Sequence, residues 1–442
     1  MVPVPEVVPG GLFGGVFTRG GAVADDAAWL RAMLAAEAGL ARALERAGLA
    51  PAGAGAAVTE AALGPVDGFD IAELSMSSEM TGNPVPGLAR ALTRLVGSPA
   101  GKAAVHQGAT SQDIMDTGAM LLARDALDAV LVDIAAAADA AARLAGTHRA
   151  TLMIGRTLLQ QAVPTTFGAV SAGWLTGLDS AHEGLAFVRG SRLAVQFGGA
   201  AGTLASLGDA GARVKTLLAE ELKLADPPLP WHTDRLRIVD VAFAMARTCA
   251  VLSKIARDVT LLTQTEVGEV KSNPVAAVAI LGCVKQAPGL LATLTAAAEQ
   301  EHQRAAGAWH AEWQPYSQLL QLTVSASAWA RDMLGNLQVD TAKMAANLAS
   351  AGGTPLAERV SALLGPALGG PQAHDLVTTA TARAAASGIP LRDVLLAAPE
   401  IADKLSQAGI TPGQVEQALD PAGYLGASSA FIDAALAAHQ PG

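Results

Sequence analysis

The chain has 442 residues, a formal charge of −10 and a pI near 5.3. This acidic balance argues against nucleic acid as a partner, because a nucleic-acid interface needs a surplus of Lys and Arg. The longest uncharged apolar run, residues 274–284, covers about 11 residues, short of the 18 or more that a membrane-spanning helix needs, so no membrane association is expected. The first residues carry no basic stretch, so no secretory signal is expected, and a cytoplasmic location is predicted.

The composition predicts an all-α fold. Aromatic residues make up only 4% of the chain, and the apolar content is dominated by Ala and Leu, which favour helix. Short helices are expected before about residue 105, including one over residues 27–47. Longer helices follow, one with a narrow apolar seam around Ile255 and Val259, which is typical of a helix bundle. The expected domains are an N-terminal helical domain over residues 1–111, a central bundle of long helices over residues 112–350, and a C-terminal helical domain over residues 351–442.

The two cysteines, Cys249 and Cys283, lie within apolar helical patterns. They are expected to be small core residues in a reducing compartment. Neither belongs to a cluster of Cys and His, and His302 and His310 are eight residues apart, an unusual spacing for a metal pair on one helix. No metal site is therefore expected.

The segment 106–117 places polar side chains where a long helix is expected to begin. Thr110 and Asp113 have the spacing of a capping box. Capping alone does not account for the other polar residues of these two turns, among them His106 and Ser111. Free N–H groups and hydroxyls at a helix N-terminus suit a carboxylate. The segment is predicted to contact an anionic substrate, with pure capping as the alternative.

The next two polar or Gly-rich segments are less specific. In residues 155–166, Arg156 and Gln160 are four apart, which predicts one shared helix face; a surface ion pair is the alternative for the arginine. The Gly-rich stretch 196–203 lacks the Lys of a phosphate loop, so it is predicted to be a close-packing turn.

Two further segments combine histidine, arginine and tryptophan. Residues 231–237 carry His232 and Arg235 after a Pro-rich loop, and such residues bind anions through bidentate contacts. The alternative is the solvated start of the next helix. Residues 300–313 bring His302 and Arg304 close to two tryptophans, in a chain that is poor in aromatic residues.

Taken in order, these segments resemble a known family over nearly the whole chain. The matching pieces are residues 106–113 (His-Gln-Gly-Ala-Thr-Ser-Gln-Asp), 155–157 (Gly-Arg-Thr), 159–160 (Leu-Gln), 196–199 (Gln-Phe-Gly-Gly), 231–233 (Trp-His-Thr) with Arg235, 264–266 (Gln-Thr-Glu), 271–274 (Lys-Ser-Asn-Pro), 309–313 (Trp-His-Ala-Glu-Trp), 420–421 (Asp-Pro) and 424–426 (Tyr-Leu-Gly). They resemble the fumarase/aspartase superfamily. The pieces at 309–313 and 424–426 point to its 3-carboxy-cis,cis-muconate lactonizing branch.

Three positions depart from the pattern of this superfamily. Leu158 stands where most of its lyases have a histidine, which fits a cycloisomerase better than a fumarase. Gln161 stands where lactonizing enzymes often have a histidine, so an acid-base role does not transfer to it. A segment is missing between Val270 and Lys271. In similar enzymes it has roughly 15 residues and carries the catalytic serine, and this length is typical of loops that close over a substrate. Either the natural protein carries this segment, or the chain has lost its serine.

The resemblance implies an all-α, fumarase/aspartase-like fold with a long central helical bundle flanked by two smaller helical domains. It also implies that a carboxylate of a small tricarboxylate substrate adds across a C=C bond to give 4-carboxymuconolactone, as in protocatechuate breakdown. The residues implied for stabilising the enolate-like intermediate are Lys271, Asn273, Thr110 and Ser111. Those implied for substrate binding are His106, Gln112, Asp113, Arg156, Thr157, Gln160, His232, Arg235, His302 and Arg304.

The resemblance further implies a homotetramer without metal or organic cofactor, whose active sites combine the Thr-Ser, Gly-Arg-Thr and Lys-x-Asn-Pro segments of different subunits. Two alternatives stay open. One is a fumarate-releasing lyase similar to adenylosuccinate lyase. The other is a catalytically silent, carboxylate-binding helical oligomer, if the serine segment is truly lost.

Overall fold

The computed structural model describes residues 11–64 and 68–441. Contacts group the chain into two compact units, each assembled from three separate segments. Unit 1 contains the chain up to Ile134 together with Ser180–Ala256 and Val275–Arg331; unit 2 contains Ala135–Asp179, Arg257–Pro274 and the chain from Asp332 onward. The predicted division at residues 111 and 350 stays a prediction.

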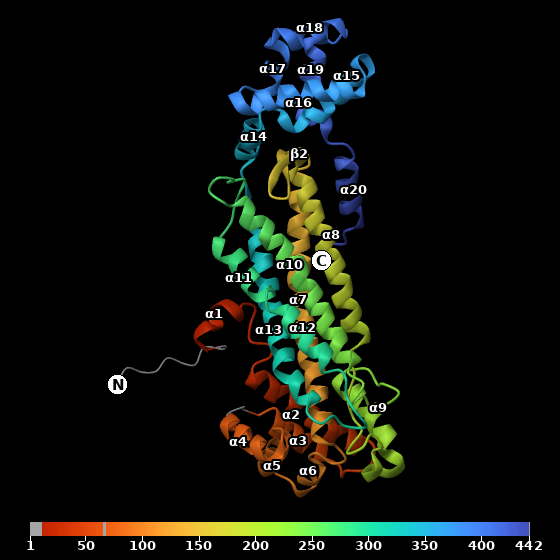
Figure 1. Ribbon diagram of the computed structural model, residues 1–442. Helices are drawn as coiled ribbons and strands as arrows, with labels where there is room; N and C mark the ends of the chain where they lie inside the picture. Colours follow the sequence, from red (N-terminus) through yellow and green to blue (C-terminus); the bar gives the residue numbers. More distant parts are fainter. Residues whose placement is uncertain (1–10, 65–67, 442) are drawn as a thin grey trace, which may run out of the picture. The chain divides into compact units, whose positions relative to one another are not determined.

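The secondary-structure elements described in unit 1 are all helices, joined by loops that include one isolated bridge between Ala194 and Ala225 (Figure 1). Its elements are η1 (Gly11–Phe13), α1 (Gly14–Phe17), α2 (Asp26–Arg46), α3 (Ala54–Ala62), α4 (Ile71–Thr81), α5 (Val85–Leu95), α6 (Pro99–Ala104), η3 (Ala205–Ala210), α9 (Gly211–Leu222), α11 (Pro274–Val284) and α12 (Ala287–Ala296). Four long helices contribute to both units: α7 (Ser111–Thr147), α8 (Phe167–Ser191), α10 (Leu236–Leu262) and α13 (Ala308–Gly335).

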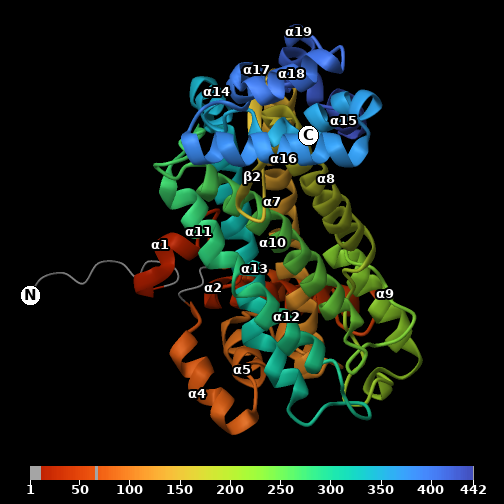
Figure 2. The ribbon, with the colours of Figure 1, turned by 45° about the horizontal axis from the view of Figure 1, so that its top comes forward.

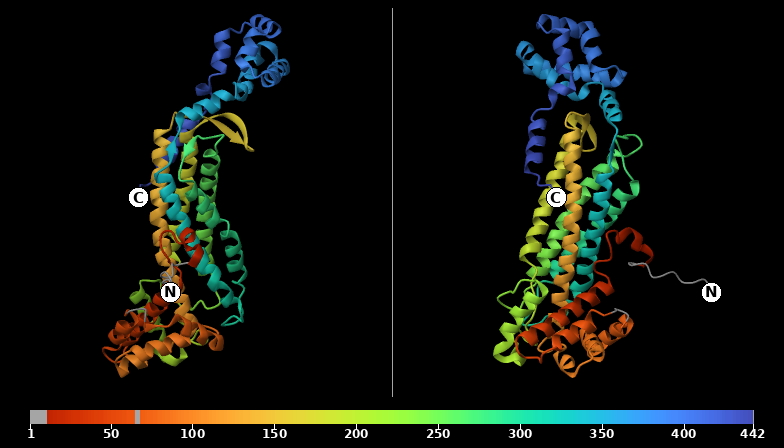
Figure 3. Two further views of the ribbon diagram at one scale, coloured as in Figure 1. Left: turned by 90° about the vertical axis from the view of Figure 1, so that its left-hand side faces the viewer. Right: turned by 180° about the vertical axis from the view of Figure 1, so that it is seen from behind.

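Helix α2 shows how the sequence sets the first elements. Asp25 caps it by accepting a hydrogen bond of 2.8 Å from the backbone N–H of Ala28, which satisfies one of the donors that a helix start leaves free. Its apolar face, which includes Leu30 and Leu34, is buried. Helices α3 and α9 pack against it, and Figure 3 shows this group in red to orange with α9 in yellow-green. The predicted helix over residues 27–47 is confirmed within one residue at each end.

The unit 1 parts of α7, α10 and α13 run side by side (Figures 1 and 3). The hydroxyl of Tyr316 on α13 donates to the carbonyl of Ala119 on α7 at 3.1 Å, and the Ser327 hydroxyl donates to the Asp133 carboxylate at 3.1 Å. Along α10, Leu252 and Ile255 are at most 1% exposed. The predicted apolar seam and the all-α class are both confirmed.

Unit 2 holds two short antiparallel sheets and a group of helices. Its elements are β1 (Leu152–Thr157), β2 (Gln160–Thr166), β3 (Val270–Lys271), β4 (Gln338–Val339), α14 (Thr341–Ser350), η4 (Thr354–Leu356), α15 (Ala357–Leu368), α16 (Gly370–Ser387), α17 (Leu391–Ala397), α18 (Pro399–Gln407), α19 (Pro412–Ala418), η5 (Pro421–Tyr424) and α20 (Ser428–Ala438). Helices α15 to α19, in blue in Figure 2, share a core that contains Val360, Leu364, Leu391 and Val415.

One stretch of the described chain, Pro274–Ala296 (23 residues), is long and apolar enough to cross a membrane; an 18-residue window within it has mean hydropathy 1.7, and 39% of that window is buried. The stretch contains one charge, Lys285, so it does not contradict the expectation that no uncharged apolar run approaches 18 residues. In the fold the stretch is two helices, α11 and α12, separated at Lys285 and Gln286. A single stretch of this kind is weak evidence for a span, because core helices pass the same test.

Candidate active site

Asp113 is the residue on which the polar centre of unit 1 is assembled. It is the third residue of α7 and only 1% exposed. Its carboxylate accepts hydrogen bonds from the backbone N–H groups of Thr110, Gly198 and Gly199 (3.0, 3.0 and 2.9 Å) and from Nε2 of Gln196 (3.1 Å), and it contacts Nε2 of His232 at 2.7 Å. The Thr110 contact is one half of the expected capping box. The remaining contacts bind the α7 start to two segments that are distant in sequence.

The Gly-rich stretch is a close-packing turn, as predicted. A Cβ at Gly198 would lie 2.8 Å from Cβ of Pro230 and 2.9 Å from Cε1 of His232. Gly199 has φ +66°, and a Cβ there would lie 3.0 Å from the carbonyl of Gly108. Both glycines therefore let the backbone come close enough to donate to the Asp113 carboxylate.

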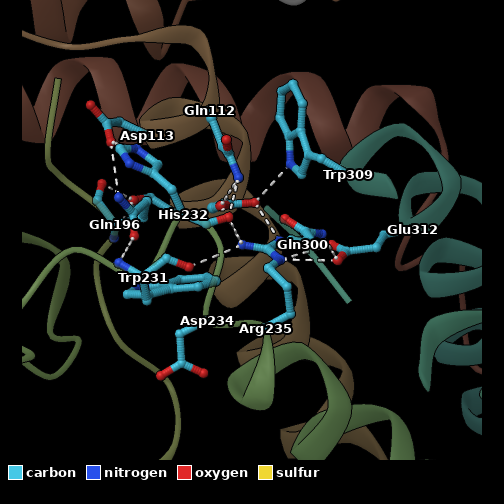
Figure 4. Close-up of polar contacts among 12 residues, drawn as sticks. Gln112, Asp113, Gln196, Trp231, His232, Asp234, Arg235, Gln300, Trp309 and Glu312 are labelled. Atoms are coloured by element: carbon cyan, nitrogen blue, oxygen red, sulfur yellow. Dashed lines mark hydrogen bonds and ion pairs between the residues drawn. The ribbon is translucent and has the colours of Figure 1, made fainter. Parts of the chain in front are cut away.

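Arg235 lies between two carboxylates in the interior of unit 1 (Figure 4). It is 2% exposed, and its guanidinium donates to both oxygens of Asp116 (2.7 and 2.9 Å) and to Glu312 from Nη2 (2.7 Å) and Nε (3.0 and 3.2 Å). Trp309 donates its indole N–H to Asp116 at 3.1 Å, and Gln300 donates to Glu312 at 2.9 Å. This guanidinium is therefore already paired within the protein by bidentate, charge-assisted hydrogen bonds.

Burial and charge act against each other in this cluster. Burial works against the charged form of Arg235, but Asp116 and Glu312 outweigh it, and the pKa of the guanidinium is raised. Burial also raises the pKa of Glu312, with Asp116 adding to the effect and Arg235 opposing it. Because two carboxylates share one guanidinium, a proton on Glu312 would bring the cluster to neutrality. Burial raises the pKa of the neighbouring Tyr316 as well.

Gln112 and Arg304 connect this cluster to the glycine turn. Nε2 of Gln112 donates to Asp116 (3.1 Å) and to the carbonyl of His232 (2.8 Å). Its oxygen accepts a hydrogen bond of 3.0 Å from Arg304, which also donates to the carbonyls of Gly199 (3.3 Å) and Ala200 (2.9 Å). Four residues predicted to bind substrate, Gln112, Asp113, His232 and Arg235, are at most 4% exposed and hydrogen-bonded internally.

His106 forms a separate pair with Glu37 of α2. Nδ1 of His106 lies 2.6 Å from Oε1 of Glu37, and the backbone N–H of His106 donates to Oε2 at 2.9 Å. The His106 side chain is 24% exposed, whereas the Glu37 side chain is fully buried. Burial works against the charge of the imidazole, but the hydrogen bond and charge of Glu37 outweigh it, so the pKa of His106 is raised.

Thr110 and Ser111 stand at the very start of α7 and are partly exposed. Within residues 11–64 and 68–441, neither hydroxyl has a hydrogen-bond partner. His302 has φ +51°, and its carbonyl accepts a hydrogen bond of 3.0 Å from Thr233. His310 contacts the carbonyl of Gly82 at 3.0 Å through Nε2.

Residues 152–166 form a hairpin, so the expectation that Arg156 and Gln160 share a helix face was wrong. Strands β1 and β2 pair Thr157 with Gln160, and the turn consists of Leu158 and Leu159, with φ +52° and +64°. Positive φ at both central residues gives a turn whose twist matches paired strands. The β-branched residues of this segment, among them Val163, favour strand over helix.

Within unit 2, Arg156 is held by Glu269. Its guanidinium donates to both carboxylate oxygens at 2.9 and 2.8 Å, and Asn347 donates to the same carboxylate at 2.8 Å. Thr157 and Gln160 are exposed at the hairpin tip. The arginine thus has an internal bidentate partner, which is closer to the alternative of an ion pair than to an unpaired anion site.

The chain passes from Val270 to Lys271 within the short strand β3. Val270 pairs with Val339 and Lys271 with Gln338 of β4. The Lys271 side chain is 70% exposed and lies 3.4 Å from Asp340. Asn273 directly precedes α11. The residues that should flank the expected serine segment, Val270 and Lys271, are therefore consecutive in this chain, and both pair with β4.

Comparison with known proteins decides the family. Residues 22–277, which are 256 of the 442 residues, match the family model described as "Lyase", and residues 353–435 match "Adenylosuccinate lyase C-terminus". The chain belongs to this lyase family. The predicted membership of the fumarase/aspartase superfamily is confirmed.

The lyase is similar to relatives over nearly its whole length. It is 43% identical to nitrosuccinate lyase from Streptomyces davaonensis, with 94% of this chain and 91% of the relative covered. It is 42% identical to 3-carboxy-cis,cis-muconate cycloisomerase from Bradyrhizobium diazoefficiens, with 94% of each covered. Its fold is similar to the crystal structure of 3-carboxy-cis,cis-muconate lactonizing enzyme from Pseudomonas putida (TM-score 0.89, 39% identity, 96% and 98% covered). The predicted resemblance to the lactonizing branch is thereby confirmed.

Sequence reasoning about this lyase missed three carboxylates and one amide. Glu37 was not singled out, although it is a buried charge among the apolar residues of α2. Glu312, Gln300 and Glu269 also stood within noted motifs but were given no role. For Glu37 the available signal was a charged residue within an apolar pattern, since such residues are rarely buried unless paired.

Proposed function

We propose that the chain is a 3-carboxy-cis,cis-muconate cycloisomerase that forms 4-carboxymuconolactone in the breakdown of protocatechuate. The observation that carries the proposal is similarity over almost the full length, both to cycloisomerase sequences at up to 42% identity and to a lactonizing enzyme structure with a TM-score of 0.89. The substrate is a small tricarboxylate. One of its carboxylate oxygens adds to the C=C bond, and a proton is delivered to the carbon next to another carboxylate.

The start of α7 is the proposed carboxylate site of unit 1. Thr110 and Ser111 present hydroxyls that have no protein partner among the described residues, at the N-terminus of a 37-residue helix. The N–H groups and dipole of such a terminus favour negative charge, so they stabilise the charge that builds on the substrate carboxylate. His106 is partly exposed and lies a few residues before this start in the sequence. His302 is exposed, and its carbonyl accepts a hydrogen bond from Thr233. These two are the proposed binding histidines.

The buried polar residues act one step away from the substrate in this proposal. Asp113, Gln112, His232 and Arg235 hold the α7 start, the glycine turn and the segment after Pro230 in one arrangement. Arg304 spans Gln112 and the glycine turn and remains a proposed substrate ligand. Because all four buried residues are satisfied internally, their contribution is positioning.

Unit 2 supplies the remaining proposed residues. The ammonium of Lys271 is largely exposed and pairs only at 3.4 Å with Asp340, so it is available to a substrate carboxylate. Asn273 is proposed to donate to the enolate-like intermediate. Arg156, Thr157 and Gln160 of the hairpin are proposed to bind the substrate, with Glu269 setting the orientation of Arg156.

We propose a cytoplasmic homotetramer that needs no metal or organic cofactor for this addition and does not bind nucleic acid or membrane. Exposed large apolar side chains on unit 1 helices support self-association: Phe187 and Phe243 are each 59% exposed and Val278 is 62% exposed. In the tetramer, the Thr-Ser, Gly-Arg-Thr and Lys-x-Asn-Pro segments would come from different subunits. Light scattering after size-exclusion chromatography gives the subunit number directly.

The activity test follows the loss of 3-carboxy-cis,cis-muconate by its ultraviolet absorbance. Parallel assays use nitrosuccinate, because of the 43% identical relative, and adenylosuccinate. Turnover of the muconate alone supports the proposal. Turnover of nitrosuccinate or adenylosuccinate alone replaces it with a fumarate-lyase type of reaction, and no turnover leaves the silent carboxylate-binding oligomer.

The intact mass of the natural protein decides the status of the serine segment. A mass above 44.5 kDa by roughly 1.5 kDa, expected for about 15 residues, would place the segment in the natural protein. A mass of 44.5 kDa would mean that the lyase has to deliver its proton from another group.

A further inference from the structure

The four histidines of the motif segments differ in what their ring nitrogens do. The His232 ring is 4% exposed and uses Nε2 on Asp113. His310 uses Nε2 on the carbonyl of Gly82, and its ring contacts those of Trp309 and Trp313. His302 has a ring without a hydrogen-bond partner, so nothing among the described residues orients it. His106 combines a carboxylate-paired ring with a side chain that is 24% exposed, whereas the carboxylate-paired His232 is buried and His310 contacts a carbonyl.

The geometry of His106 is set by one carboxylate. Glu37 accepts from the backbone N–H and contacts Nδ1 at 2.6 Å, so it fixes the main chain and the ring together. His106 has φ +58°, a conformation that a residue with a side chain adopts at a cost. The two contacts with Glu37 hold it there. Nε2 has no hydrogen-bond partner among the described residues, and the ring is 24% exposed.

We propose that Glu37 and His106 form the proton-transfer pair of this enzyme, in which Nε2 of His106 protonates the substrate carbon. This inference rests on the proposed cycloisomerase function. Glu37 is a positioning residue that acts through His106. The catalytic serine of similar enzymes is not among the 442 residues, and this pair supplies a proton without it.

The proposed step balances in atoms and charge. A substrate carboxylate oxygen forms a C–O bond, and the π electrons of the C=C bond move into the adjacent carboxylate to give the enolate-like intermediate. The N–H bond at Nε2 then breaks and a C–H bond forms at the α-carbon. His106 is left neutral with Nδ1–H still donated to Glu37, and water returns the proton to Nε2.

The charges around the ring favour the protonated donor. Glu37 faces it from α2, and Asp113 of α7 adds a weaker attraction for the proton; both oppose the effect of burial. The raised pKa of His106 keeps more of the imidazolium at neutral pH than a free imidazole would have. A general acid with a pKa near the working pH is the most effective.

Three variants of the full chain test the pair. H106N removes the acid while keeping a residue type that tolerates positive φ. E37Q keeps the shape of the side chain but removes its charge. H374N is the matched control, because His374 is exposed on α16 and belongs to no proposed site. Each variant is measured by circular dichroism, by pH-rate profiles with 3-carboxy-cis,cis-muconate, and by NMR titration of 13C-labelled histidine rings, with H106N assigning the His106 signal.

The expected result is a fall in kcat of about 10²–10⁴ in H106N, the usual loss for a general acid, and no change in H374N. In the parent, kcat/KM falls as pH rises through the His106 pKa. In E37Q, both this descending limb and the NMR titration move to lower pH by about one pH unit or more, because the attractive charge is gone while burial remains.

Two outcomes overturn the proposal: a folded H106N with parental kcat, or an E37Q that is slower with its descending limb unmoved. If H106N unfolds, the E37Q profile and titration decide. An inactive parent overturns the proposed function and with it the proton-donor role. The NMR titration would still show whether Glu37 and His106 are paired, which separates the two failures.

Discussion

Replacing Arg235 with Met should be among the most destabilising single changes in unit 1. The substitution keeps a long apolar stem but leaves Asp116 and Glu312 with side chains only 3% and 4% exposed and without their cation. Breaking a buried ion pair by removing one partner costs about 3–5 kcal/mol of unfolding free energy, since the remaining charge stays desolvated. At about 2 °C per kcal/mol for a chain of this size, the midpoint should fall by roughly 6–10 °C.

Urea unfolding followed by tryptophan fluorescence measures this loss close to its origin. Trp231 supplies the ring over which Arg235 lies, at 5.0 Å, and Trp309 donates to Asp116, so two of the six tryptophans report directly on the cluster. The matched control is R189M, because Arg189 pairs with Asp128 at the surface, where such a pair contributes about 0–1 kcal/mol.

A second variant separates charge from hydrogen bonding. E312Q removes one of the two carboxylates that share the guanidinium, so it should lose only about 1–2 kcal/mol, the cost of imperfect hydrogen bonds. Because the pKa of Glu312 is raised in the fold, the parent is relatively more stable at low pH and loses that contribution as pH rises through the raised pKa; E312Q should lack this dependence. The reasoning is refuted if R235M is no less stable than R189M, or if E312Q is as unstable as R235M.

Three further predictions concern other parts of the chain. Burial opposes protonation of His439, but hydrogen bonds to two aspartates outweigh it and raise the pKa. The stabilisation of the chain end after α20 by His439 is therefore complete below the pKa of a free imidazole and is lost as pH rises through the raised pKa. Hydrogen exchange in α20 should therefore quicken over that range in the parent but not in H439N, and equal pH dependence in both would contradict this. Replacing Leu158 with Asn and Leu159 with Gly relieves two positive φ angles and should raise the unfolding free energy by about 1 kcal/mol in thermal unfolding; an unchanged or lower midpoint would rule out strain at this turn. Burial raises the pKa of Cys249 to about 12 and of Cys283 to about 11, so a thiol reagent should label them only after unfolding, and rapid labelling of the folded chain would show that these thiols are accessible.

The sequence predicted the helices and their starts well because those signals are local. The apolar face of residues 27–47 predicted α2, and Thr110 with Asp113 predicted the start of α7. The hairpin was missed for a local reason too. Its turn is Leu158 and Leu159, with none of the Asn or Gly residues that mark such turns, so the spacing of Arg156 and Gln160 suggested a helix instead.

The internal pairings of the candidate site were beyond local reasoning. Arg235 was expected to meet a substrate anion, but its anions are Asp116 and Glu312, which lie 119 and 77 residues away in the chain. A cationic side chain in a motif indicates that an anion binds there. Only the packed fold shows whether that anion is a carboxylate of the protein or part of a ligand. Glu37 was missed for the same reason, since its partner is 69 residues away.

The discontinuity of unit 1 also has a consequence for how the chain is made. Its three segments are interleaved with those of unit 2, and the last of them ends at Arg331. Asp116 lies in the first segment, whereas Glu312 and Trp309, which complete its hydrogen-bonded cluster, lie in the third. The first segment therefore leaves the ribosome before these partners are made. At about 5–20 residues per second, the roughly 200 residues between Ile134 and Arg331 take about 10–40 s to synthesise. For that interval the apolar faces of α2 and α7 have no completed bundle to cover them, which makes the nascent chain a natural client for chaperones that bind exposed apolar helices.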